Sequence, residues 1–189
     1  MTDASIASRS VLVLTASDLS AAGEREDASG AGVERRLMEL GFRVVRRVVP
    51  DDRPTIELAL RDAAARHPLV FTTGGTGLTP RDVTPQATLA VVDYEVPGMA
   101  EAMRAEGRRH TPMADLSRAV VGVAGRSLIV NLPGSPKGAL ESLEAIVPIL
   151  DHALETLAGP FDHAGASSGA SSAATGATAE SSERAESTR

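Results

Sequence analysis

Residues 72–85, with the sequence TTGGTGLTPRDVTP, combine glycines, hydroxyl side chains and a carboxylate in a pattern that suits the binding of an anion. Because glycine has no side chain, the main chain at Gly74, Gly75 and Gly77 can approach a ligand closely and point consecutive N–H groups at phosphate oxygens. The run is neither a Walker A loop, since no Gly-Lys-Ser/Thr follows the glycines, nor a GxGxxG motif. It predicts a phosphate-binding loop, with a purely structural strand-to-helix turn as the alternative.

Asp82 favours the ligand-binding interpretation of this run. It lies five residues after Gly77, directly behind the glycine loop, where a carboxylate can hold a metal ion beside a phosphate. A local ion pair with Arg81 is the alternative role for its side chain. The Thr76 hydroxyl can donate to a phosphate. We expect Thr84 to cap the next helix, with Pro85 in its first turn, so that the positive end of that helix also faces the loop.

A second loop, residues 132–138 with the sequence LPGSPKG, contains Lys137, the only lysine in a chain with nineteen basic residues. A compact ammonium group at the start of a helix suits a phosphate as a point charge. A solvated lysine on a first helical turn is the alternative. Ser135 in the same loop can donate to a phosphate or cap the helix that follows.

Alternating strands and helices must position these loops. Apolar, β-branched runs predict strands, and apolar positions at helical spacing predict helices. Pro148 removes a hydrogen bond from the last helix and should kink or split it. The alternation predicts an α/β protein, a three-layer sandwich with a mostly parallel central sheet. We expect strands at 11–15, 42–49 and 69–72 and two within 119–132, and helices at 30–40, 54–66, 85–92, 98–109 and 138–158.

Ligands in such sheets bind beyond the carboxyl ends of the strands, and the polar residues of this chain fall at those ends. Thr15 and Ser17 follow the first strand, and Asp51 follows the second. Asp51 and Asp82 suffice for Mg²⁺, which takes one or two carboxylates together with phosphate oxygens and water. A turn or helix cap is the alternative role for Asp51. Asp27 is most simply a helix-entry residue.

The composition excludes several classes of protein. A formal net charge of -6 leaves no basic field that would suggest nucleic acid, and the absence of cysteine excludes thiolate catalysis and cysteine-ligated metals. The four histidines show no metal-ligand spacing. No long apolar run suggests a membrane span, and no hydrophobic signal peptide begins the chain, so we expect a cytoplasmic protein.

Composition also predicts the domain boundaries. Residues 161–189 are rich in glycine, alanine, serine and glutamate and almost lack large apolar side chains, so they cannot offset the entropy lost on ordering. We expect a disordered tail there, a flexible N-terminus over residues 1–8, and one folded domain over residues 9–160.

Three segments closely resemble the MoaB/Mog family of molybdenum-cofactor biosynthesis proteins: TTGGTGLTPRDVTPQAT, SRAVVGVAGRSLIVNLPGSPKGA, and VPDD after the second strand. The match covers roughly residues 10–158. The resemblance implies a compact α/β domain, usually a homotrimer, that binds molybdopterin. Active members of the family adenylylate molybdopterin with Mg-ATP and release pyrophosphate, and a handover of product to a molybdenum-insertion enzyme is implied.

The resemblance implies that Asp82 and Asp51 are the catalytic carboxylates and hold Mg²⁺. The chain departs from the family pattern at Gln86, where many members have an acid, and at Met99, within a stretch that reads PGFGE in other members. Together with the strand-end residues, the resemblance predicts a substrate-binding set of Thr15, Ser17, Gly74, Gly75, Thr76, Gly77, Glu101, Pro133, Gly134, Ser135 and Lys137.

The predicted chemistry needs no activated nucleophile. The terminal phosphate of molybdopterin is already anionic, so positioning and charge neutralisation supply most of the catalysis of its attack on ATP. One alternative is a non-catalytic molybdopterin-binding paralogue or interaction module. A molybdenum-insertion enzyme would carry further domains that we do not expect in a chain of this length. A general nucleotide hydrolase would need a water-activating residue that the sequence does not suggest.

Overall fold

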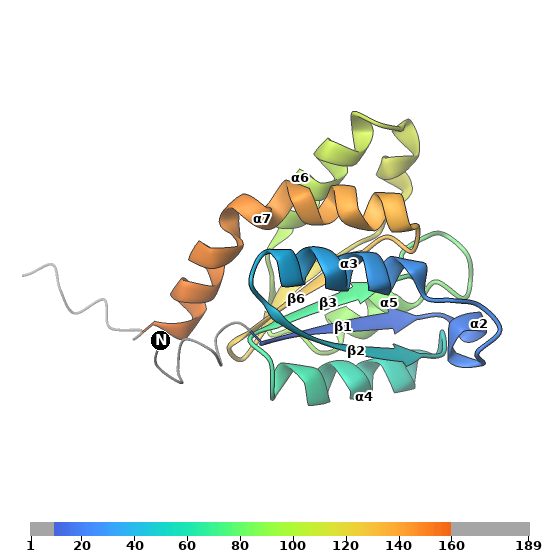
Figure 1. Cartoon of the computed structure of the whole chain (residues 1–189), viewed down its shortest axis with the longest axis horizontal. Helices are drawn as coiled ribbons and strands as arrows, with labels where there is room; N and C mark the ends of the chain where they lie inside the picture. Colours follow the sequence, from blue (N-terminus) through green and yellow to red (C-terminus); the bar gives the residue numbers. More distant parts are fainter. Residues whose placement is uncertain (1–9, 160–189) are drawn as a thin grey trace, which may run out of the picture. The chain divides into compact units, whose positions relative to one another are not determined.

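The computed structural model describes residues 10–159, and the predicted terminal segments 1–8 and 161–189 lie outside the described residues. Figure 1 shows strands and helices alternating along most of the chain. The elements are β1 Ser10–Ala16, α2 Asp18–Ala21, α3 Ala28–Glu39, β2 Arg43–Val49, α4 Arg53–Ala64, β3 Leu69–Thr73, α5 Thr84–Leu89, β4 Tyr94–Glu95, α6 Pro97–Arg108, the 3₁₀ helix η1 Pro112–Leu116, β5 Val121–Ala124, β6 Ser127–Leu132 and α7 Pro136–Ala158.

One six-stranded sheet organises the described residues, with the strand order β2-β1-β3-β6-β5-β4. The first four of these strands are parallel, so that Val13 of β1 pairs with Phe71 of β3, which pairs with Val130 of β6. The last two strands, β5 and β4, run antiparallel to their neighbours. The prediction of a mostly parallel sheet is confirmed, and the carboxyl ends of β2, β1, β3 and β6 meet at one edge.

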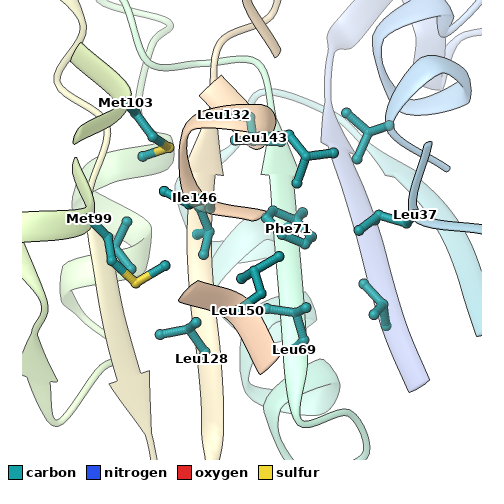
Figure 2. Packing of buried hydrophobic residues seen from close by; sticks show 14 of the residues in the cluster. Leu37, Leu69, Phe71, Met99, Met103, Leu128, Leu132, Leu143, Ile146 and Leu150 are labelled. Carbon is teal, nitrogen blue, oxygen red and sulfur yellow. The ribbon is translucent and has the colours of Figure 1, made fainter. Parts of the chain in front are cut away.

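The sheet is covered on both faces, because its central strands β1, β3 and β6 are buried on both sides. Val11 and Val13 of β1 belong to a core with α3, α6 and α7, whereas Leu12 and Leu14 belong to a second core with α4 and α5. Figure 2 shows Phe71 of β3 among leucine and isoleucine side chains of α7. A fully buried side chain of this size contributes about 1.5–3 kcal/mol. The three-layer prediction is confirmed.

The last helix, α7, is a single element that begins earlier than expected. Ser135 is its N-cap and Pro136 its first residue, where proline costs no hydrogen bond. Pro148 lies inside the helix, and Figure 1 shows α7 bending partway along its length. Proline therefore kinks this helix without splitting it.

Three short elements were not predicted from the sequence: α2, β4 and η1. They contain four, two and five residues. Segments this short show no apolar periodicity, because a single helical turn or one pleat contains too few positions to establish a pattern. Both α2 and η1 nevertheless border the candidate site, as the lining residues of its two pockets show.

Candidate functional site

The glycine loop, residues 74–83, begins at the carboxyl end of β3 with two glycines in the left-handed region. The φ angle is 91° at Gly74 and 64° at Gly75. A Cβ atom on Gly74 would lie 2.4 Å from the Ala16 carbonyl oxygen, and one on Gly75 would lie 2.3 Å from Thr84 Oγ1. Both positions require glycine, because other residues rarely adopt this conformation and the neighbouring atoms leave no room for a side chain.

Thr84 packs against the glycine loop and does not cap α5, so the capping prediction was wrong. Val83 holds the N-cap position without a side-chain hydrogen bond, and Thr84 is already helical. The Thr84 side chain is fully buried, and its hydroxyl has no hydrogen-bond partner among the described residues. The main chain of Thr84 instead donates to the Gly75 carbonyl at 3.1 Å and closes the loop onto the helix.

Asp82 lies near the end of the glycine loop, and the loop's own main chain holds its carboxylate. Asp82 Oδ2 accepts a hydrogen bond from the Thr79 N–H at 2.8 Å, whereas Oδ1 has no protein partner within the described part of the chain. The alternative of an ion pair with Arg81 is wrong, because Arg81 pairs with Asp18. One oxygen of Asp82 is therefore available to a ligand.

Asp51, at the carboxyl end of β2, forms a reciprocal pair with Asp18 of α2. The Asp18 N–H donates to Asp51 Oδ2 at 3.0 Å, and the Asp51 N–H donates to Asp18 Oδ1 at 2.9 Å. Burial raises the pKa of the Asp51 carboxyl above its ordinary value, and the negative charge of Asp82 acts in the same direction. Asp52, not Asp51, caps α4, so Asp51 is not held by a capping role.

A buried polar network around Asp27 was not predicted beyond the helix-entry role of that residue. Asp27 caps α3 by accepting from the Gly30 N–H at 2.8 Å, and it also accepts from the Thr15 hydroxyl and from Arg46, each at 2.8 Å. Burial alone would raise the pKa of Asp27, but these hydrogen bonds outweigh burial and lower the pKa. An ionised Asp27 therefore fixes Thr15 at the site. The spacing of these two residues in the sequence does not predict their hydrogen bond.

The second loop, residues 132–138, packs against the first. A Cβ atom on Gly134 would lie 3.2 Å from the Cα of Gly74. Ser135 Oγ accepts from the Gly138 N–H at 3.2 Å as the cap of α7. Lys137 extends into solvent with 79% of its side chain exposed, and its Nζ lies 3.6 Å from Glu141 Oε1.

Two pockets meet at these loops. The carboxylate pocket, of about 540 Å³, lies at the carboxyl ends of β1, β2 and β3, and its charged lining residues are Arg25, Glu26, Asp27, Asp51, Arg81 and Asp82. The methionine pocket, of about 370 Å³, is bordered by α6, η1 and the start of α7 and includes Met103, Met113 and Leu116. Three residues line both pockets: Gly75, Asp82 and Gly134.

Most of the predicted site residues line one of these two pockets. The carboxylate pocket is lined by Thr15, Ser17, Asp51 and Gly74. The other predicted residues that line a pocket are Thr76, Gly77, Pro133 and Ser135 in the methionine pocket and Gly75, Asp82 and Gly134 in both. Glu101 is exposed on α6 and lines neither pocket, and Lys137 also lies outside both linings. Within residues 10–159, no three histidine, aspartate or glutamate side chains gather closely enough to bind a metal on their own.

Comparisons with known proteins match this domain closely. A family model described as a probable molybdopterin binding domain matches residues 12–152. A molybdopterin adenylyltransferase of Helicobacter pylori is 38% identical over 154 residues, which cover 79% of this chain and 88% of that protein. A molybdopterin adenylyltransferase of Haemophilus influenzae is 43% identical over 141 residues, which cover 71% of each protein.

Solved structures give the same match. The molybdopterin biosynthesis enzyme MoaB from Thermus thermophilus has 52% sequence identity and a TM-score of 0.74, and the match covers 78% of this chain and 95% of that one. Among the described helices, none has both the length and the apolar character needed to cross a membrane.

Proposed function

The chain belongs to the family of molybdopterin-binding domains that includes the MoaB and Mog proteins, and from this premise we propose that it is a molybdopterin adenylyltransferase. The reaction transfers AMP from Mg-ATP to molybdopterin and releases pyrophosphate. The observation that carries the proposal is the rim shared by the two pockets, where Gly75, Asp82 and Gly134 line both cavities. Joining two phosphate-bearing substrates requires such a meeting point.

The residues at the rim suit a phosphate as the nucleophile. An oxygen of the terminal phosphate of molybdopterin attacks the α-phosphorus of ATP, the bond from that phosphorus to the bridging oxygen of the β-phosphate breaks, and pyrophosphate leaves with that electron pair. Since the attacking oxygen is already anionic, no general base is needed. The two loops hold the phosphates in line through their main-chain N–H groups, so positioning supplies much of the rate.

Asp51 and Asp82 fit a magnesium ion. Each carboxylate uses one oxygen in a hydrogen bond to the main chain and leaves the other without a protein partner among residues 10–159, and both residues line the carboxylate pocket. These two oxygens, together with substrate phosphate oxygens and water, complete the ligand set that Mg²⁺ prefers. When bound there, Mg²⁺ neutralises charge that develops on the phosphate oxygens.

The two pockets differ in a way that divides the substrates between them. The carboxylate pocket contains Asp51 and both arginines and suits the Mg-triphosphate, whereas the methionine pocket offers apolar surface to an organic ring system. Lys137 lies outside both linings and extends into solvent beside Glu141, so it would have to reorient to reach a phosphate in either pocket. Glu101 is absent from both linings, so neither pocket supports its predicted role.

Assembly, location and the next step of the pathway rest on the family resemblance. We propose a homotrimer, which sedimentation or light scattering at micromolar concentration tests; a monomer would contradict it. Dependence on ATP fits a cytoplasmic enzyme. The product is an activated anhydride, which suits direct handover to a molybdenum-insertion enzyme.

A product assay with labelled ATP tests the proposed activity. The protein, molybdopterin, ATP and Mg²⁺ should yield adenylylated molybdopterin and pyrophosphate in equal amounts, and omission of molybdopterin should abolish pyrophosphate release. Calorimetric binding of both substrates without product would favour the non-catalytic binding module. Phosphate release from ATP without molybdopterin would favour a nucleotide hydrolase.

A further inference from the structure

Arg118 holds the glycine loop from outside both pockets. It lies between η1 and β5, and its main-chain N–H donates to the Thr76 carbonyl at 3.0 Å. Its side-chain Nε donates to the Gly77 carbonyl at 2.7 Å, and a terminal nitrogen of the same guanidinium donates to the Asp82 carbonyl. A single residue therefore binds three carbonyl oxygens of the strand-to-helix segment that carries Asp82.

The two guanidinium contacts fix the width of the turn between Gly77 and Asp82. A guanidinium is planar and presents its donors at a fixed separation, so it holds the two carbonyls at a set distance. Within that turn the Thr79 N–H holds the Asp82 carboxylate at 2.8 Å. A Cβ atom on Gly77 would lie 3.0 Å from Asp82 Oδ2. The direction of the Asp82 carboxylate thus depends on the turn that Arg118 closes.

Arg118 reaches the site only through this loop. Its neighbours Ser117 and Ala119 line the methionine pocket, but Arg118 itself is absent from the linings of both pockets. Its side chain is partly buried, and both of its hydrogen bonds go to main-chain carbonyls. A lysine would keep the charge but lose the pair of donors at fixed separation, here called the guanidinium fork, because its ammonium is a single point donor.

We infer that Arg118 is a positioning residue that sets the Asp82 carboxylate at the rim shared by the two pockets. The inference rests on the proposed adenylyltransferase function and adds a residue that substrate contacts alone would not identify. Since Asp82 is a proposed Mg²⁺ ligand, loosening its loop should weaken the response to Mg²⁺ and slow turnover. Affinity for molybdopterin should change much less, because the pocket linings keep their residues.

Arg118→Lys tests the inference, with Arg61→Lys as the matched control. Arg61 also donates from its guanidinium to a main-chain carbonyl, that of Ala90 at 2.6 Å, and it lies outside the two pockets at the site. In Arg118→Lys we expect turnover to fall about 10-fold or more. The Mg²⁺ concentration for half-maximal activity should rise several-fold, and Arg61→Lys should match the wild type in both measurements.

Hydrogen exchange supplies a readout that is independent of activity. Peptides covering residues 74–84 should exchange about 5-fold faster in Arg118→Lys than in the wild type or in Arg61→Lys, while peptides from β1 and β6 stay protected. If the wild type transfers no AMP, the proposed function fails, and this comparison still decides the role of Arg118. Unchanged exchange in the loop would overturn the inference.

A second variant separates positioning from general destabilisation. Arg118→Ala removes the fork, and added ethylguanidinium can restore a guanidinium in the space left behind. We expect the ion to recover a substantial part of the lost Mg²⁺ response in Arg118→Ala and to have no effect on Arg61→Ala. A lower yield of active protein with wild-type Mg²⁺ dependence, and no recovery with ethylguanidinium, would show that Arg118 serves the fold alone.

Discussion

The two loops at the shared rim resemble each other in composition, but they are held in different ways. The glycine loop is fixed by contacts from other parts of the chain: Ala16 and Thr84 crowd its glycines, and Arg118 binds its carbonyls. The second loop is mainly the start of a helix, with Ser135 as its cap and Lys137 in solvent. Glycine and proline content alone therefore does not tell whether a loop is rigidly positioned or merely ends an element.

This difference indicates that the two loops have different roles in catalysis. Two residues of the glycine loop adopt left-handed φ angles, and within residues 10–159 one oxygen of the loop's Asp82 carboxylate has no protein partner. Glycine adopts these angles without strain, and the Ala16 carbonyl and the Thr84 hydroxyl leave no room for a side chain at either position. Gly134 of the second loop is not in the left-handed region. We therefore expect substitutions near the glycine loop to affect the chemical step, and substitutions in the second loop to affect binding.

Asp51→Asn should reduce activity as strongly as Asp82→Asn, because it removes the other proposed Mg²⁺ ligand. AMP transfer at saturating Mg²⁺ should fall at least about 100-fold. Stability should not fall, because burial raises the pKa of Asp51 and so makes its ionised form unfavourable to folding. The asparagine oxygen can still accept from the Asp18 N–H.

The pH dependence of the melting temperature tests whether the ionised Asp51 carboxylate destabilises the folded protein. The free-energy cost of burying the ionised Asp51 carboxylate is fully present above its raised pKa in the folded protein. It disappears as the pH falls below the ordinary pKa of aspartate, because the folded and unfolded states then bind the proton alike. Asp51→Asn should therefore melt at or above the wild-type temperature near neutral pH, and the advantage should vanish in acid. In the activity assay, near-normal AMP transfer by Asp51→Asn at saturating Mg²⁺ would contradict the metal-binding role of Asp51.

Gly74→Ala tests the enforced geometry of the glycine loop, with Gly125→Ala as its control. Both glycines have positive φ, but a Cβ at Gly125 would meet no atom within 4 Å, whereas at Gly74 it would meet the Ala16 carbonyl oxygen. The control should lose about 1–2 kcal/mol from conformation alone. Gly74→Ala should lose more, by at least about 1 kcal/mol, because the main chain must shift. Equal losses in denaturant titrations would mean that the loop is not held against β1.

Lys137→Gln should have the smallest effect of the series. The side chain is 79% exposed and lies 3.6 Å from Glu141, so the free energy of unfolding should change by about 0.5 kcal/mol or less. If Lys137 reaches a phosphate from solvent, calorimetric affinity for Mg-ATP or molybdopterin should fall a few-fold. Unchanged affinity for both substrates would show that Lys137 is a solvated residue. The second loop would then bind phosphate through its main-chain N–H groups and not through the Lys137 side chain.

The sequence was sufficient to predict the alternating fold and both loops, because apolar periodicity and glycine clustering are local properties. It also placed Asp51 and Asp82 together, because parallel strands bring their carboxyl ends to one edge. It did not predict that Arg81 pairs with Asp18, that Thr84 packs under Gly75, or that Arg118 closes the loop. Each of these contacts joins residues whose separation in space is decided by tertiary packing, which no local pattern encodes.

Single-turnover transfer by Asp82→Asn and Ser135→Ala, measured side by side with the wild type, tests the division between the two loops most directly. Asp82→Asn should slow the chemical step at least about 100-fold at saturating substrates. Ser135→Ala should keep a near-normal chemical step, require more substrate for saturation, and lose about 1 kcal/mol of stability from the missing cap. A normal chemical step in Asp82→Asn, or an equal loss in both variants, would contradict the account.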